Sequence, residues 1–275
     1  MEREQKSERL TDAEVRDKVV GVWDEINRWH RRLGERWWPA EGSDLRADHD
    51  AAEGFTPSFL AWTSLSIATD CMLTASAYAL NFGPTLFSMQ PLLHTALVGG
   101  AQTVWLLAPD DQTSRLERAG QLAKDSHLRH KEWADGLEDV HPGAIDRAEL
   151  ALARQRLADL DAGGKHQQVL QTRAIRRAAE HVYSSPTNGR QISAEVVSEW
   201  RGLSAVAHGL PWEQSNRPGR LASEQDGVRT TSIEASWPQL QGAFSDAYAF
   251  LETGWRLLDQ RGSALPVQKP GTHGY

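Results

Sequence analysis

Most of this 275-residue chain repeats one pattern, in which apolar side chains recur every three or four positions between helix-capping residues and prolines or glycines. In the first such segment, Thr11 and Glu14 form a capping-box sequence ahead of an apolar series that begins at Val15. About eight helices with short connections predict an all-α fold, a helical bundle. The same signals place the predicted helices at residues 11–33, 57–80, 88–108, 110–133, 144–161, 165–183, 193–208 and 236–260.

Two stretches lack the helical period. Residues 39–55 are rich in glycine and acidic residues, and we expect them to form a loop. Residues 211–235 contain Asp226-Gly227, a dipeptide typical of two-residue turns, so we expect one short β-hairpin near 220–233.

The predicted helices fall into two ranges along the chain. Residues 1–87 carry the N-terminal helices, which we expect to pack on the same bundle as residues 88–260. The remaining residues, 261–275, contain little apolar sequence and are expected to form a flexible tail.

Composition narrows the classes of function. A net charge of −7 and a pI near 5.8 exclude an extended basic surface for binding nucleic acid but leave room for a local basic pocket. The single cysteine, Cys71, has no intrachain disulfide partner, and the charged start MEREQKSERL lacks the apolar core of a signal peptide. Both features favour the cytoplasm. The apolar runs 59–80 and 92–108 contain too many polar residues for membrane spans, so we expect buried helices and no membrane partner.

The helix expected at 193–208 carries the residues with the clearest chemical potential. Ser193 is placed to cap it, and a Gly-Leu-Pro sequence ends it. Arg201 and His208 lie seven positions apart, which at about 100° per residue is only about 20° short of two full turns. They therefore share a helix face at a separation of roughly 10 Å, with Ser204 between them.

An arginine and a histidine on one face suit the metal-independent cleavage of RNA. Histidine moves protons near neutral pH, and arginine binds two phosphate oxygens and stabilises the charge of the transition state. A symmetric dimer would supply a second acid or base to the same cleft. The alternative interpretation is an exposed arginine and a histidine that the helix dipole favours at a C-terminus.

The run Glu199-Trp-Arg-Gly-Leu-Ser-Ala-Val-Ala-His-Gly209 resembles the Arg-x4–6-His motif of the HEPN superfamily, in particular HEPN-like helical proteins of actinobacteria. Residues 92–109, followed by Arg115 and Arg118, resemble an earlier segment of those proteins, and the resemblance covers roughly residues 88–260. Gly202 departs from the pattern, since active members often carry a polar residue directly after the arginine.

The resemblance implies a helical bundle that forms homodimers and cleaves RNA in toxin–antitoxin or phage-defence systems. Its expected partners are RNA and an antitoxin or regulatory protein, and it implies no cofactor or metal. Arg201 and His208 match the motif, with Arg201 as the phosphate clamp and His208 as the general acid/base. Ser204 is assigned to orienting the substrate or the histidine.

Three further side chains are candidates for binding the substrate. His94 lies in an apolar helix, where it either faces the Arg201/His208 cleft as a second proton carrier or forms a hydrogen-bonded part of the core. Arg173 and Arg177 belong to a basic group that either binds phosphate or forms a charged surface paired with Glu180.

The sequence also contains residues that suggest a metal site and a small-ligand site. His127 and His130 share a helix face near two carboxylates, but no zinc or metalloprotease spacing is present, so we expect a solvated surface. The eleven tryptophans support an alternative to the nuclease: a non-catalytic helical protein that binds a protein partner or a small ligand in a tryptophan-lined pocket. A third hypothesis is a small-molecule enzyme that uses the region around His94.

Overall fold

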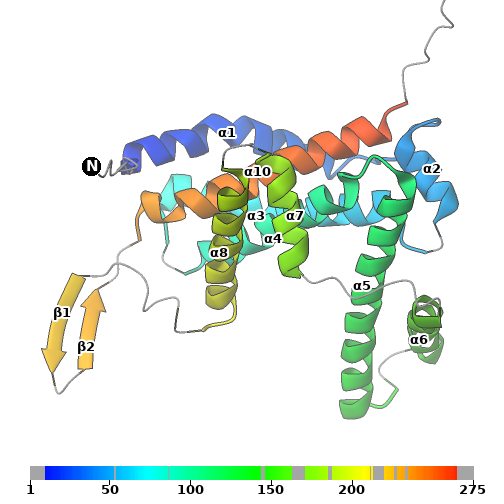
Figure 1. Cartoon of the computed structure of the whole chain (residues 1–275). Helices are drawn as coiled ribbons and strands as arrows, with labels where there is room; N and C mark the ends of the chain where they lie inside the picture. Colours follow the sequence, from blue (N-terminus) through cyan, green and yellow to red (C-terminus); the bar gives the residue numbers. More distant parts are fainter. Residues whose placement is uncertain are drawn as a thin grey trace, which may run out of the picture. The chain divides into compact units, whose positions relative to one another are not determined.

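The computed structural model confirms the all-α fold class and describes residues 10–52, 54–85, 87–143, 146–162, 171–184, 188–210, 212, 220–225, 228–232 and 235–264. The helices shown in Figure 1 are α1 (Asp12–Arg32), α2 (Asp44–Ala51), α3 (Pro57–Phe82), α4 (Met89–Leu107), α5 (Gln112–Val140), α6 (Arg147–Ala162), α7 (Gln171–Val182), α8 (Gly189–Ala207) and α10 (Trp237–Gly262). None of the helices described in these ranges is long and apolar enough to cross a lipid bilayer.

Three helix starts follow the capping signals in the sequence. The Thr11 hydroxyl accepts a hydrogen bond from the Glu14 amide, and the Glu14 carboxylate accepts one from the Thr11 amide, which completes the predicted capping box of α1. Thr56 accepts a hydrogen bond from the Phe59 amide at 3.1 Å where α3 begins. Asp111 likewise accepts one from the Ser114 amide at 2.7 Å at the start of α5.

Three boundaries differ from the sequence prediction. The loop expected at 39–55 contains α2, which Ser43 caps by accepting a hydrogen bond from the Arg46 amide. Helix α5 continues through Gly136, because α6 packs on α5 and Lys131 and Arg154 both pair with Asp135 across that turn.

The third difference concerns the start of α8. The helix begins at Gly189, one turn before the predicted capping residue Ser193. Ser193 is therefore inside the helix, where its hydroxyl donates a hydrogen bond to the Arg190 carbonyl at 3.2 Å.

The predicted hairpin is present. Strand β1 (Arg220–Gln225) pairs antiparallel with β2 (Val228–Ser232), and Gln225 lies opposite Val228. The strands therefore flank the Asp-Gly dipeptide at 226–227 that predicted the turn.

The described residues divide into two compact units that each combine distant parts of the sequence. The first unit takes the described residues up to Arg36 together with those of Thr63–Trp105 and Thr172–Trp255. The second unit takes those of Trp37–Trp62 and Leu106–Gln171 and the described residues from Arg256 onward. Each unit thus draws on both of the expected ranges, 1–87 and 88–260.

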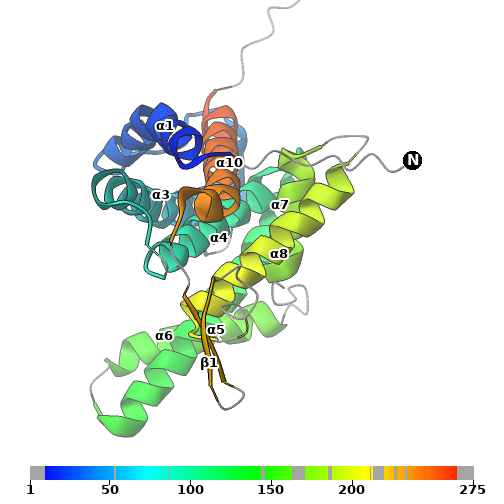
Figure 2. The same cartoon turned by 90° about the vertical axis from the view of Figure 1, so that its left-hand side faces the viewer.

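In the first unit, α1, α3, α4 and α10 run alongside one another, and α7 lies next to α8 (Figures 1 and 2). Two adjacent glycines of α4 bring three helices close together. A Cβ atom on Gly99 would lie 2.7 Å from the Ser64 carbonyl oxygen of α3, and one on Gly100 would lie 2.8 Å from Phe250 Cβ of α10. The glycine pair is therefore a helix-packing feature of the core.

Aromatic side chains attach α1 and α3 to α10 in this unit. The Trp29 ring of α1 lies 5.5 Å from the Tyr248 ring of α10, and the Arg32 guanidinium lies 4.4 Å from the ring centroid of Trp255. Buried Trp255 donates its indole N–H to the hydroxyl of Thr69 on α3 at 3.1 Å. The tryptophan therefore contributes apolar burial without leaving its N–H unsatisfied.

The second unit is built around two buried arginines. Arg115 of α5 pairs with buried Asp48 of α2, with distances of 2.6 Å from Nε and 2.9 Å from Nη2 to the carboxylate oxygens. Arg261 of α10 donates to the Leu107 carbonyl at 2.6 Å and to the carboxylates of Asp44 and Asp110.

Helix α10 extends into the range 261–275, which was expected to form a flexible tail. Helix α10 continues to Gly262, and the Arg261 side chain is only 7% exposed. The Gly262 carbonyl accepts a hydrogen bond from the Ala40 amide at 2.8 Å, which ties the helix end to the chain after α1. Residues 265–275 of the expected tail lie outside the described residues.

Candidate functional site

The end of α8 sets the position of His208. Gly209 has φ +66°, which a residue with a side chain rarely adopts. The Leu210 amide donates to the Ala205 carbonyl at 2.8 Å, and the Gly209 amide donates to the Val206 carbonyl at 3.0 Å. These two bonds form a Schellman motif, so α8 ends at the predicted glycine and His208 is its exposed C-cap residue.

Arg201 lies on the same helix with its side chain in solvent. Val197, Leu203 and Ala205 of the same helix are buried and attach α8 to the unit. Ser204 is half-buried, and its carbonyl accepts the amide hydrogen bond of His208 at 3.0 Å. Within the described part of the chain, Arg201 forms no hydrogen bond or ion pair, so its guanidinium donors are available.

His94 of α4 belongs to the same unit and interacts electrostatically with His208. Burial lowers the pKa of the His94 imidazole, and a positive charge on His208 lowers it further. The Nε2 atom of His94 is buried and has no hydrogen-bond partner among the residues that the structure describes. His94 is thus within reach of the charge of His208, and its Nε2 atom is not satisfied as that of a core histidine would be.

The two candidate arginines of α7 are both exposed. Ala174, Ile175 and Ala178 form the buried face of this helix. Arg177 pairs with Glu180 at 2.8 Å, whereas Arg173 has no ion pair in the described ranges. No hydrogen bond or ion pair between described residues joins these arginines to Arg201 or His208.

Two other sequence candidates have structural roles. Arg115, part of the second segment that resembles HEPN proteins, is buried in its ion pair with Asp48. His127 is 6% exposed and stacks on Phe55 at 4.9 Å, so the solvated surface expected around it was wrong at this position. Burial lowers the pKa of His127, and the charges of Arg156 and His130 lower it further. No group of three potential metal ligands lies together among the described residues.

The structure also contains a pocket whose residues the sequence did not single out. It has a volume of about 330 Å³ and lies in the second unit, between residues 37 and 62. Five of its lining residues are aromatic, and the sequence offered only the clustering of Trp37, Trp38 and Trp62 as a signal.

Comparison with known proteins gave no relative: no family model matches the chain, and neither the curated proteins nor the solved structures contain a significant match.

Proposed function

We propose that this protein is a HEPN-like, metal-independent endoribonuclease with Arg201 and His208 in its active site. The observation that carries the proposal is that Arg201 is exposed on the same helix as exposed His208 and forms no hydrogen bond or ion pair with a described residue. The charge of His208 also lowers the pKa of the His94 imidazole, which adds a second histidine to the site. Two histidines and a free arginine are the groups that cleavage through the 2′-hydroxyl requires.

The proposed reaction moves one proton on and one proton off the substrate. A histidine takes the proton of the 2′-hydroxyl, and the freed oxygen forms a bond to the neighbouring phosphorus. The bond from phosphorus to the 5′-oxygen breaks, and a second histidine protonates that oxygen. The products are a 2′,3′-cyclic phosphate and a 5′-hydroxyl.

The charge of each side chain determines its proposed role in the reaction. Because its pKa is lowered, His94 is neutral at neutral pH and suits the role of proton acceptor. His208 acts as the general acid/base, Arg201 binds the phosphate oxygens, and Ser204 orients the substrate or His208. Exposed Arg173 provides local positive charge for RNA on an otherwise acidic protein, and Arg177 would do so by exchanging Glu180 for a phosphate.

The biological setting is part of the same proposal. We place the enzyme in the cytoplasm as a homodimer, within a toxin–antitoxin or phage-defence system. An antitoxin or regulatory protein would then keep it inactive until it is triggered. The homodimer is part of the proposal because a second copy would add another histidine and arginine to the cleft.

The test compares the wild-type protein with Arg201→Ala and His208→Ala on purified RNA in EDTA. We expect the wild-type protein to release 5′-hydroxyl ends, which a polynucleotide kinase labels without prior dephosphorylation, and both variants to lose at least 100-fold in rate (roughly the share of one acid–base or charge-stabilising group).

Matched controls come from the same chain. His141 is the exposed C-cap residue of α5, as His208 is of α8, and Arg16 is an exposed arginine of α1. His141→Ala and Arg16→Ala are expected to cleave at the wild-type rate. Intact RNA with the wild-type protein, or equal losses in the control variants, would overturn the proposal.

A further inference from the structure

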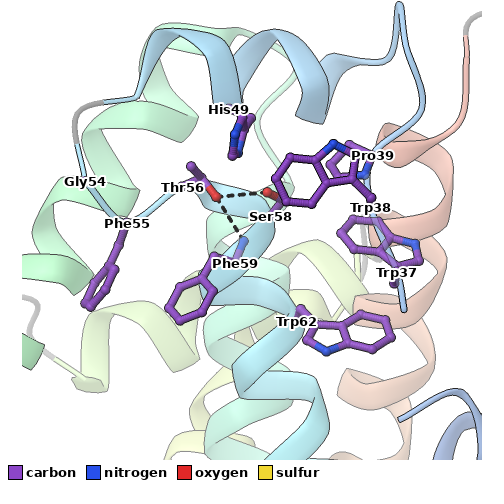
Figure 3. Close-up of a pocket in the computed structure, with 10 residues that line it drawn as sticks. All are labelled: Trp37, Trp38, Pro39, His49, Gly54, Phe55, Thr56, Ser58, Phe59 and Trp62. Carbon is purple, nitrogen blue, oxygen red and sulfur yellow. Dashed lines mark hydrogen bonds between the residues drawn. The ribbon is translucent and has the colours of Figure 1, made fainter. Parts of the chain in front are cut away.

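The aromatic pocket of the second unit has the size and lining of a small-molecule site (Figure 3). Its volume of about 330 Å³ falls at the lower end of the range for ligand pockets. Its aromatic walls are Trp37, Trp38, Phe55, Phe59 and Trp62.

Contacts among these rings hold the walls in place. Trp37 stacks on Trp62 with centroids 5.4 Å apart and planes 7° apart, and Phe55 lies 5.2 Å from Phe59. A Cβ atom on Gly262 would lie 2.8 Å from the Trp37 ring, so this tryptophan is also fixed against the end of α10. The pocket therefore exists before any ligand arrives.

Two of the walls are large aromatic side chains that remain in water. Trp38 is 56% exposed and Phe59 is 52% exposed. Leaving such surface uncovered forgoes the favourable transfer of apolar area out of water. Neighbouring exposed aromatic side chains around a concave surface mark a binding site more often than a stable free surface.

The polar atoms of the pocket indicate what kind of molecule fits. The Thr56 and Ser58 hydroxyls are bonded to each other at 2.9 Å, and the Thr56 hydroxyl also accepts the Phe59 amide. The Nδ1 atom of His49 is buried and lacks a hydrogen-bond partner in the described part of the chain, so Nε2 is the ring nitrogen that a ligand in the pocket can reach. The edge of the His49 ring meets Trp38 at 4.6 Å and 70°, which fixes its orientation.

The absence of charged side chains from the pocket lining indicates the charge of the ligand. The lining residues include no aspartate, glutamate, lysine or arginine. An ionised ligand would lose hydration in this pocket without gaining a counter-ion. A neutral, flat ring stacks on indole and phenyl walls and covers their exposed faces.

We propose that this pocket binds a neutral, planar aromatic small molecule that donates one hydrogen bond to Nε2 of His49. The binding site is independent of the nuclease, since it uses none of the residues assigned to RNA cleavage and is measured without RNA.

Isothermal titration of the full chain with indole and with benzofuran tests the ligand class. The two molecules have nearly the same shape, and only indole has an N–H donor. We expect saturable binding of indole at one site and several-fold weaker binding of benzofuran, the share of one neutral hydrogen bond. Tetramethylammonium is the cationic probe, and tighter binding of this ion than of indole would overturn the proposal in favour of a cation site.

Substitution of His49 by phenylalanine isolates the hydrogen bond. His49→Phe keeps a ring against Trp38 but removes the nitrogen that accepts the hydrogen bond. We therefore expect the affinity for indole to fall to that for benzofuran, and the affinity for benzofuran to stay the same. An unchanged preference for indole would contradict the role of His49.

Substitution of Trp38, an aromatic residue that lines the pocket, tests whether the ligand binds there. This test stands whatever result His49→Phe gives. Trp38→Ala is expected to abolish measurable indole binding with little change in melting temperature, because Trp38 is 56% exposed. The matched control is Trp133→Ala, since Trp133 is 57% exposed and lies outside the pocket. The absence of saturable binding to the wild-type chain, or equal losses in both tryptophan variants, would overturn the proposal.

Discussion

At the scale of single residues, the arginines of this protein divide into buried ones and available ones. Arg115 and Arg261 are buried and use their planar guanidinium groups to join segments distant in sequence. Arg201 and Arg173 are exposed and unpaired among the described residues. The sequence alone did not separate the two classes, because burial of an arginine depends on carboxylates and carbonyls supplied from elsewhere in the chain.

Arg261 tests the buried class. Arg261→Met leaves the carboxylate of Asp44 and the carbonyl of Leu107 without their donor, and we expect a loss of about 3–5 kcal/mol in the free energy of unfolding. Arg261→Lys is also expected to destabilise, since an ammonium does not reproduce the fork of donors. Urea unfolding measures both variants. Arg256→Ala, at an exposed position of the same helix, should stay within about 0.5 kcal/mol of wild type.

His94 gives the protein a pH dependence with a defined sign. Its folded-state pKa is lowered by burial and by His208, so below the ordinary histidine pKa of about 6.5 the unfolded chain binds more protons than the folded one. The stability that neutral His94 contributes is present above about pH 6.5 and is lost as the pH falls toward the lowered value.

The variant His94→Gln removes this titration. We expect it to lose less stability than wild type between about pH 7.5 and 5.5, measured by urea unfolding at each pH. Thr95→Ala changes a residue of the same helix that has no titratable group. This control should shift the free energy of unfolding by the same amount at about pH 7.5 and at about pH 5.5. A parallel pH dependence in wild type and His94→Gln would contradict the assignment.

At the scale of helices and strands, local sequence signals were sufficient to predict a helix end where residues next to that end form the capping hydrogen bonds. Thr11 accepts the amide bond of the predicted capping box, Thr56 and Asp111 cap α3 and α5 in the same way, and Gly209 ends α8 as expected. The errors occurred where distant contacts decide a boundary, as at α5, whose last turns are held by Arg154 of α6. Helix α2 was missed because eight residues are too few to show a periodic pattern.

The glycines show which helices meet closely. Gly100→Ala places a Cβ atom 2.8 Å from Phe250 Cβ and 3.0 Å from the Leu251 amide nitrogen, so the backbones of α4 and α10 must separate. We expect a loss of about 1–3 kcal/mol in the free energy of unfolding. Gly136→Ala of α5 meets no atom within 4 Å and should stabilise the helix by about 0.5–1 kcal/mol. Equal effects of the two changes in denaturant unfolding would rule out the proposed contact.

At the scale of the whole molecule, the fold class and the hairpin followed from the sequence, whereas the composition of the two compact units did not. Each unit depends on contacts between segments far apart in the chain, as Trp255 with Thr69 shows in the first. The same holds for the sites. Helical spacing placed Arg201 and His208 on one face, but the proximity of His94 and the assembly of the aromatic pocket required the tertiary structure.

The proposed dimer has a consequence that single variants do not test. If Arg201 and His208 of two copies contribute to one cleft, a mixed dimer of Arg201→Ala and His208→Ala subunits retains one arginine and one histidine. We expect mixing the two inactive proteins, with time for subunit exchange, to restore part of the RNA cleavage. No recovery in a mixture whose exchange is verified by mass spectrometry would show that each copy acts alone.

The bond from Arg261 to the Leu107 carbonyl also bears on how the protein is made. The two residues are 154 positions apart, and the arginine satisfies a carbonyl at the end of α4 that the helix itself leaves unbonded. At a synthesis rate of about 5–20 residues per second, roughly 8–30 seconds pass between the emergence of the two partners from the ribosome. During that interval the second unit lacks one of its central ties, so this part of the protein completes its folding only after Arg261 has emerged.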